Sequence, residues 1–291
     1  MLKNAISAIK KSDGLVRLLA INAIVFVVIQ VVHIFSRFSE NDRFVEAHPD
    51  LYLAATSNPA RLLDRPWSIF THMFTHEEVG HFIFNIFCLY TGGRLFRFFL
   101  DSKKLVVNYI LGGLSGFLLF FIFFNLFPAL PKDSYILGAS AAVMSIIITV
   151  GVVQPNYRIK LFGVFEMKLM WLCIILVFVD LVSLRKGFNS GGHIGHLGGA
   201  LFGLIYGLNF QKNRNMGSWL ENLFSKISGM FGGKKSHLQT VHKRPITDDE
   251  FNAEKVKRQK RVDEILDKIN RSGYESLSKE EKDYLFKYSQ K

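Results

Sequence analysis

The stretch HIGHLGGALFGLIYG, residues 193–207, sets two histidines and a series of small residues inside an apolar segment. A histidine at bilayer depth is costly and usually marks function, so His196 needs a partner. Gly199, Gly203 and Gly207 follow it at four-residue spacing, and small residues at this spacing allow membrane helices to approach closely. The stretch therefore predicts a membrane helix that holds a histidine against a neighbouring helix.

The 291 residues divide into an apolar part, up to about residue 211, and a polar tail. A stretch of roughly 18 or more apolar residues with few charges is a candidate transmembrane helix. Six such stretches lie near 15–35, 78–100, 105–128, 135–153, 168–184 and 193–210. We therefore expect an all-α, polytopic membrane protein in which residues 1–211 form a six-transmembrane-helix bundle.

The net charge of +12 is unevenly distributed. Lysines and arginines cluster before the first expected span, in the loops after the second and fourth spans, and through the tail, whereas the long loop 36–67 mixes both signs. The positive-inside rule then predicts that both termini are cytoplasmic. Basic cytoplasmic flanks explain the charge, so we expect no nucleic-acid partner.

The tail changes character at about residue 250. Glycines with neighbouring lysines favour a flexible basic linker over 212–250. Over 251–291, apolar residues recur at helical spacing, and Ser278 and Glu281 have the spacing of a capping box. We expect a small cytoplasmic helical unit that packs on itself, on the membrane surface or on a partner that the sequence does not identify.

Residues 193–207 form one polar island, meaning a short polar segment within an apolar stretch. A second polar island, Gly138-Ala139-Ser140, is surrounded by small side chains. They would let another helix or a substrate backbone approach the hydroxyl of Ser140. A serine in a membrane helix also commonly bonds its own helix backbone. If the helix of Ser140 neighbours that of His196, however, the imidazole can take the hydroxyl proton, and the pair can act as nucleophile and base.

A third polar island runs from His72 through His76 to His81 and Asn85. His81 and Asn85 are four residues apart, so they share one helix face. Both side chains can donate hydrogen bonds to a developing oxyanion. The alternative is that they only bond neighbouring helices. His72 and His76 are expected to be structural.

The histidines also raise the possibility of a metal site, which we disfavour. A zinc-protease motif places two histidines at positions i and i+4, whereas His76 and His81 are five apart. No cluster of cysteines or membrane aspartates completes a tetrahedral set. Cys88 and Cys173 both fall within expected spans, so we expect packing there and no disulfide. We expect no metal and no cofactor.

Asp180 lies near the end of the fifth expected span. It could orient a histidine as the third member of a catalytic triad. It could also be an interfacial residue that caps or gates the outer end of the helix, and we favour this second interpretation. The role of His193 is left open.

Taken together, these islands resemble a known family. The sequences WSIFTHMFTH (67–76), HFIFN (81–85) and YTGG (90–93) look like the signature leading into the second span of rhomboid intramembrane serine proteases. The sequence GAS (138–140) is similar to that family's Gly-x-Ser motif, and HLGGALFG (196–203) to its catalytic-histidine helix. The resemblance covers about residues 65–210 and puts the motifs on the second, fourth and sixth spans.

The resemblance implies a serine endopeptidase that cleaves the transmembrane helices of membrane-protein substrates in the lipid bilayer, through an acyl-enzyme. It implies Ser140 as nucleophile and His196 as general base. The implied oxyanion hole consists of His81, Asn85 and the backbone N–H of Ser140, and the implied close-packing residues at the site are Gly138, Gly199 and Gly203. It also implies a membrane-embedded loop after the first span and a location in a bacterial inner membrane.

Two positions depart from the family pattern. Ala141 stands where the family usually has glycine, which leaves slightly less room beside the nucleophile. Met144 stands where many members place a tyrosine against the catalytic ring, which puts that stacking contact in doubt. Two other functions stay open: an inactive relative that escorts membrane proteins, and a histidine-lined transporter. Inactive relatives typically lack the serine or the histidine, and a transporter would need paired intramembrane carboxylates.

Overall fold

The computed structural model describes residues 13–38, 49–161, 163–185, 189–214, 216–231 and 248–289. The chain divides into two compact units, Met1–Phe231 and Gly232–Lys291. The first unit carries every candidate site residue.

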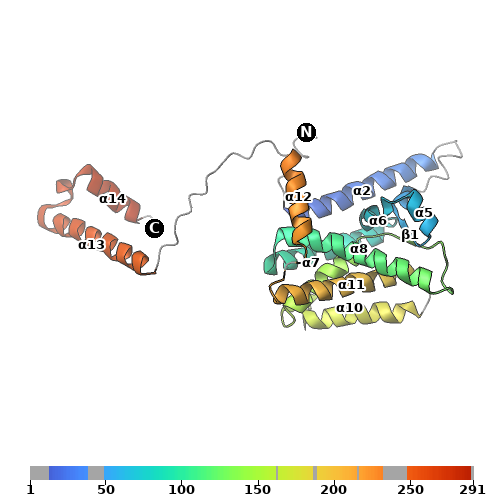
Figure 1. Cartoon of the computed structure of the whole chain (residues 1–291). Helices are drawn as coiled ribbons and strands as arrows, with labels where there is room; N and C mark the ends of the chain where they lie inside the picture. The colour runs from blue at the N-terminus through green and yellow to red at the C-terminus, as the bar shows by residue number, and fades with distance from the viewer. Residues whose placement is uncertain are drawn as a thin grey trace. The chain divides into compact units, whose positions relative to one another are not determined.

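The described part of the first unit contains six long helices that correspond to the six expected spans (Figure 1). They are α2 (Gly14–Arg37), α7 (Val79–Phe99), α8 (Ser102–Leu126), α9 (Ser140–Val153), α10 (Leu169–Leu184) and α11 (Ser190–Gln211). Among the described residues, α2 and α8 are long and apolar enough to cross a membrane by length and composition, while α9 and α10 are shorter apolar helices. The expectation of an all-α membrane bundle is confirmed.

The start of α9 differs from the expected span. Residues Tyr135–Ile136 form strand β2, which pairs antiparallel with β1 (Ala55–Thr56). Gly138 then has a φ of +114°, a conformation that side chains with a Cβ rarely adopt. The helix consequently begins at Ser140 rather than near residue 135, because the preceding residues are used in a strand and a turn.

Short elements connect the long helices. Between α2 and α7 lie α4 (Pro49–Leu53), β1, α5 (Pro59–Asp64), α6 (Ser68–Thr71) and the 3₁₀ helix η1 (His72–Phe74). The hairpin β3 (Arg158–Leu161) and β4 (Phe165–Lys168) joins α9 to α10. Part of the loop 36–67 lies outside the described residues, and its position in the membrane stays a prediction.

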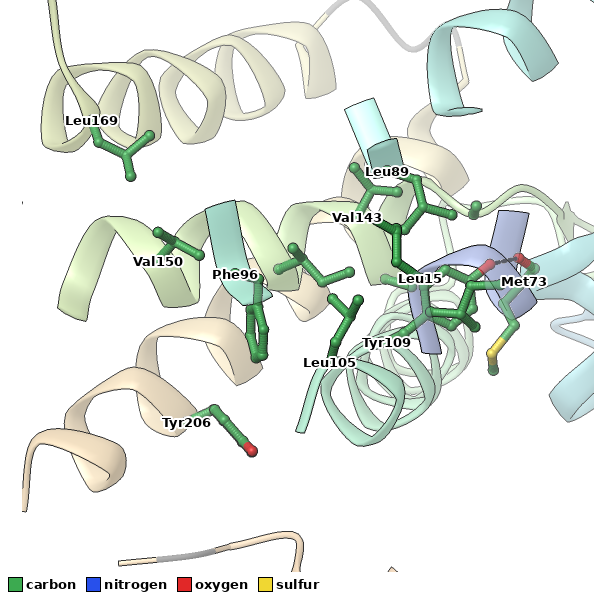
Figure 2. Close-up of a cluster of buried hydrophobic side chains, with 14 residues drawn as sticks. Leu15, Met73, Leu89, Phe96, Leu105, Tyr109, Val143, Val150, Leu169 and Tyr206 are labelled. Carbon is green, nitrogen blue, oxygen red and sulfur yellow. Dashed lines mark hydrogen bonds between the residues drawn. The ribbon is translucent and has the colours of Figure 1, made fainter. Parts of the chain in front are cut away.

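The helix α9 lies at the centre, in contact with α7, α8, α10 and α11. Figure 2 shows buried side chains from all six long helices gathered around it. The labelled members are Leu15, Leu89, Phe96, Leu105, Tyr109, Val143, Val150, Leu169 and Tyr206, together with Met73 of η1. Because lipid tails are as apolar as these side chains, close packing rather than the hydrophobic effect holds such helices together.

The expectation of a flexible linker over 212–250 is wrong for part of that range. Helix α12 (Ser218–Phe231) belongs to the first unit and contacts α8, and its Leu220 is buried. Leu220, Leu223 and Ile227 recur at helical spacing in the sequence. This periodicity favours a helix more strongly than Gly229 favours a loop. Residues 232–247 lie outside the described ranges.

The second unit contains α13 (Asp248–Ser272), the 3₁₀ helix η2 (Tyr274–Ser276) and α14 (Lys279–Ser289). The expected capping box is confirmed: the Ser278 N–H donates to Glu281 Oε2 at 2.7 Å, and the Glu281 N–H donates to Ser278 Oγ at 3.3 Å. Lys268 Nζ donates to the same Glu281 carboxylate at 3.0 Å. An ion pair therefore links the two tail helices.

Candidate active site

The relative position of α9 and α11 is set by glycines. A Cβ added to Gly199 would collide with the carbonyl oxygen of Ala141, and one added to Gly203 would lie 2.5 Å from that of Ser145. Four residues further along α11, from Gly199 to Gly203, the contact on α9 also moves four residues forward, from Ala141 to Ser145. The helices α9 and α11 therefore run parallel and start at the same end of the bundle. His196 lies one turn before Gly199, and Ser140 immediately precedes Ala141. This register brings both beside the start of α9.

The helix α7 also starts at this end. A Cβ on Gly138 would lie 2.7 Å from His81 Cε1, 3.1 Å from His81 Nε2 and 3.7 Å from Ser140 Oγ. Further along the helices, a Cβ on Gly92 would lie 3.1 Å from Ile147 Cγ1. The helices α7 and α9 therefore run parallel. The ring of His81 and the hydroxyl of Ser140 both lie close to Gly138, where a larger residue does not fit.

The turn before Ser140 is held by two buried histidines. The Gly138 N–H donates to the carbonyl oxygen of His72 at 2.9 Å. The Ala139 N–H donates to Nε2 of His76 at 3.3 Å. His72 and His76 therefore stabilise the turn before Ser140, a specific role that the sequence did not reveal. Only contacts between segments distant in sequence could have shown it.

Asn85 is buried one turn after His81, as their spacing predicts. Its side-chain amide donates to the carbonyl oxygen of His81 at 2.9 Å, within its own helix. An amide nitrogen carries two hydrogens, so one remains for a second acceptor. The role of Asn85 as an oxyanion donor stays a prediction.

Asp180 is 4% exposed. Its hydrogen bonds agree with the interpretation that it orients a histidine, and its depth in the membrane stays a prediction. Its Oδ1 lies 2.7 Å from Nδ1 of His193 and 2.9 Å from Nδ1 of His196. The signal in the sequence was a lone carboxylate within an apolar helix. Its meaning depends on α10 packing against α11, which the sequence does not specify.

The same three side chains form a group of metal-ligating residue types in the described part of the chain. The two Nδ1 atoms and the carboxylate oxygen lie within 4.8 Å of one another. Three protein ligands fall one short of a closed tetrahedral zinc site, and hydrogen bonds already satisfy all three atoms. The donors fit a hydrogen-bonded network better than a metal centre, and the expectation of no metal stays a prediction.

Ser140 and His196 are brought to the same end of the bundle without a direct bond. Within the described ranges, no hydrogen bond joins Ser140 Oγ to His196, and none reaches Nε2 of His196. His81 and His196 lie near enough to interact electrostatically. Catalytic hydrogen bonds are often long before substrate binds, so this arrangement is compatible with a nucleophile and its base.

The two departures from the family pattern occupy defined places. Ala141 is buried, with its backbone facing Gly199 of α11 and its Cβ facing Gly116 of α8. The extra methyl is therefore accommodated by a glycine on α8. Met144 is buried in a cluster with Ile148 and Ala200. Its effect on the imidazole stays a prediction.

Comparisons with known proteins agree with this architecture. Residues 63–213 match the Rhomboid domain family, and residues 246–291 match a family of unknown function (DUF6576). The chain is 29% identical over 153 residues to "Presenilin-associated rhomboid-like protein A, mitochondrial" of Danio rerio, covering 52% of this chain and 39% of that protein.

Two further relatives are similar. "Rhomboid-like protease 3" of Toxoplasma gondii is 27% identical over 187 residues, covering 62% of this chain and 65% of that protein. "RHOMBOID-like protein 12, mitochondrial" of Arabidopsis thaliana is 25% identical over 158 residues, covering 50% and 47%. The match thus spans less than two thirds of each relative's own length.

Proposed function

This chain belongs to the rhomboid family and is an integral membrane protein, and we propose that it is an intramembrane serine endopeptidase. The observation that carries the proposal is the parallel packing of α9 and α11 through Gly199 and Gly203. This packing places Ser140, the first residue of α9, beside the turn of α11 that carries His196. A nucleophile and a base on adjacent helices are the minimum set for acyl transfer.

In the proposed reaction, Ser140 Oγ attacks the carbonyl carbon of the scissile peptide bond while its proton passes to Nε2 of His196. The C–N bond then breaks, and His196 returns the proton to the leaving amine, which leaves an ester on Ser140. Water attacks this ester, giving its proton to Nε2, and the acid product leaves as the proton returns to Ser140 Oγ. Nδ1 of His196 is hydrogen-bonded to Asp180, so Nε2 is the nitrogen available for these transfers.

The developing oxyanion would be met by donors at the starts of α7 and α9. The N–H groups in the first turn of a helix have no intrahelical acceptor, so that of Ser140 can donate to the oxyanion. His81 and Asn85 supply the side-chain donors. The positive ends of α7 and α9 also meet here, and a helix N-terminus favours negative charge.

The short length of α9 supports chemistry below the membrane surface. Its 14 residues span about 21 Å, less than the hydrocarbon thickness of about 30 Å. The first residue of a centrally placed α9 can therefore lie at membrane depth while water reaches it from the site end. We propose transmembrane helices with a locally unstable, small-residue segment as substrates, because such segments unwind most easily.

The six long helices alternate in direction, so α2 starts and α11 ends on the same side of the bundle. The basic flanks of this side support a cytoplasmic location for both ends of the membrane unit. The relatives named above include mitochondrial proteins, and they give no support to a bacterial inner membrane. The compartment stays a prediction.

The proposal is tested with the full chain in proteoliposomes and a tagged substrate whose single transmembrane helix begins with a Gly/Ala-rich segment. The parent is expected to cleave it, and Ser140→Ala to leave no cleavage. Ser145→Ala is the matched control, because Ser145 lies on the same helix and its hydroxyl instead donates to Asn108 Oδ1 at 2.9 Å. Cleavage that persists in Ser140→Ala would contradict the proposal.

The oxyanion donors are tested in the same assay. Removing one such donor costs about 10²–10³-fold in kcat, and we expect this loss for Asn85→Ala. An undiminished kcat would remove Asn85 from the proposed oxyanion hole and leave the roles of Ser140 and His196 untouched.

A further inference from the structure

Asp180 is the one charged residue in the sequence of α10, between Lys168 and Arg185. Burying a carboxylate in an apolar helix costs several kcal/mol unless it is well hydrogen-bonded, and intramembrane ionisable residues are functional by default. Asp180 is almost fully buried, and both groups hydrogen-bonded to it are imidazoles of α11. The question is what this carboxylate does for His196.

Its contact fixes the chemical state of the imidazole. A carboxylate only accepts hydrogen bonds, so Nδ1 of His196 must carry the hydrogen at 2.9 Å from Asp180 Oδ1. In a neutral ring, Nε2 then carries the lone pair. Nε2 is also the nitrogen without a hydrogen-bond partner in the part of the chain that is described. The contact therefore selects the tautomer that a base acting on Ser140 requires.

We propose that Asp180 is a positioning residue that holds His196 in this tautomer and stabilises the imidazolium formed when Ser140 loses its proton. The proposal rests on the proposed function and extends the Ser140–His196 pair to a third group on α10. His193 donates to the same carboxylate oxygen at 2.7 Å. It anchors Asp180 in place and takes no part in the proton transfer.

If Asp180 had a purely structural role, its hydrogen bonds would only hold α10 against α11, and such a link is called a tie below. Asparagine can make that tie too, because its side-chain oxygen accepts hydrogen bonds from imidazole N–H groups and its volume matches that of aspartate. It cannot supply the charge that stabilises an imidazolium, and its amide can present a donor to Nδ1 and select the wrong tautomer. Asp180→Asn therefore separates the two roles.

The test measures kcat, KM and unfolding temperature for the full chain with the Gly/Ala-rich substrate. In a serine protease of another fold, changing the histidine-orienting aspartate to asparagine lowers kcat about 10⁴-fold. We expect Asp180→Asn to lower kcat by at least about 10²-fold, with KM and unfolding temperature unchanged. His193→Asn leaves the bond between Asp180 and His196 in place, so its kcat should fall far less.

Three outcomes would overturn the proposal. The first is a parent-like kcat in Asp180→Asn, and the second is an equal loss in His193→Asn and Asp180→Asn. The third is a fall in unfolding temperature that accounts for the lost activity, which would indicate a purely structural role. His196→Ala separates this proposal from the proposed function: cleavage that persists in it would refute the function, whereas its loss beside an active Asp180→Asn would refute only the role of Asp180.

Discussion

The two helices that carry the histidine and the aspartate meet the central α9 in different ways. On α11, the buried residues are mostly glycines, and three of them, Gly199, Gly203 and Gly207, lie against backbone atoms of α9. On α10, only Leu169 and Asp180 are buried, and the contact with α9 passes through side chains such as Cys173. A groove of about 740 Å³ lies between α10 and α7, with Ile147 and Val150 of α9 at its floor.

This difference teaches that one contact sets the geometry of the site and the other tolerates change. Backbone against backbone leaves nothing that can rotate away, so a new atom must move a whole helix. Side chains can adopt other rotamers. We therefore expect substitutions that add atoms at the α9–α11 contact to damage cleavage far more than changes at the α9–α10 contact.

The largest effect is expected for Gly199→Ala. Its methyl group would meet the carbonyl of Ala141, one residue from Ser140. Overpacking typically costs 1–3 kcal/mol and occasionally more, and a clash with backbone should cost about 3 kcal/mol or more. Thermal unfolding in detergent should show this loss, and the substrate should not be cleaved. Parent-like stability would show that α9 and α11 are not closely packed.

The next effect concerns the polar network that crosses the same contact. Thr149 Oγ1 donates to the carbonyl of Gly203 at 3.1 Å and accepts from Asn108 at 2.9 Å. Thr149→Val preserves shape but removes both bonds, and hydrogen bonds between membrane helices contribute about 1–2 kcal/mol at most. We expect a lower unfolding temperature with cleavage retained. No change in stability would contradict the importance of this network.

A smaller effect is expected on α10. Cys173 Sγ lies against Gly151 and contacts the Ile147 carbonyl at 3.7 Å. Cys173→Ala removes one atom from a contact that can relax, so we expect a loss of about 1 kcal/mol or less and parent-like cleavage. Loss of cleavage in this variant would show that the α9–α10 contact is as demanding as that of α11.

The smallest effect, with opposite sign, is expected for Gly80→Ala. No atom lies within 4 Å of a Cβ built at Gly80, in the first turn of α7. Alanine is favoured over glycine within helices by roughly 0.5–1 kcal/mol, so the unfolding temperature should rise slightly. This variant is the matched control for Gly199→Ala, because it adds the same methyl where there is room. Destabilisation would show that the added methyl is not harmless even in open space.

Local patterns predicted much of this protein. Apolar length located all six long helices, and four-residue glycine spacing identified the face of α11 that meets α9. The capping box at Ser278 was also legible, because its two partners are three residues apart. Such features depend on neighbours in the sequence, and a single chain shows them directly.

The sequence was least informative where distant segments meet. The start of α9 depends on Tyr135–Ile136 pairing with Ala55–Thr56. The meaning of Asp180 depends on α10 lying beside α11, and that of His76 on its contact with Ala139. Helix α12 was missed for a different reason, because glycine and lysine content was given more weight than its apolar periodicity.

The central claim is that Ser140 is a nucleophile activated by His196. It is tested most directly by treating the membrane-embedded full chain with a fluorophosphonate and locating the label by mass spectrometry of its peptides. The account predicts covalent label on Ser140, none in Ser140→Ala, and labelling slowed by orders of magnitude in His196→Ala. Label on another residue, or an unchanged labelling rate in His196→Ala, would contradict it.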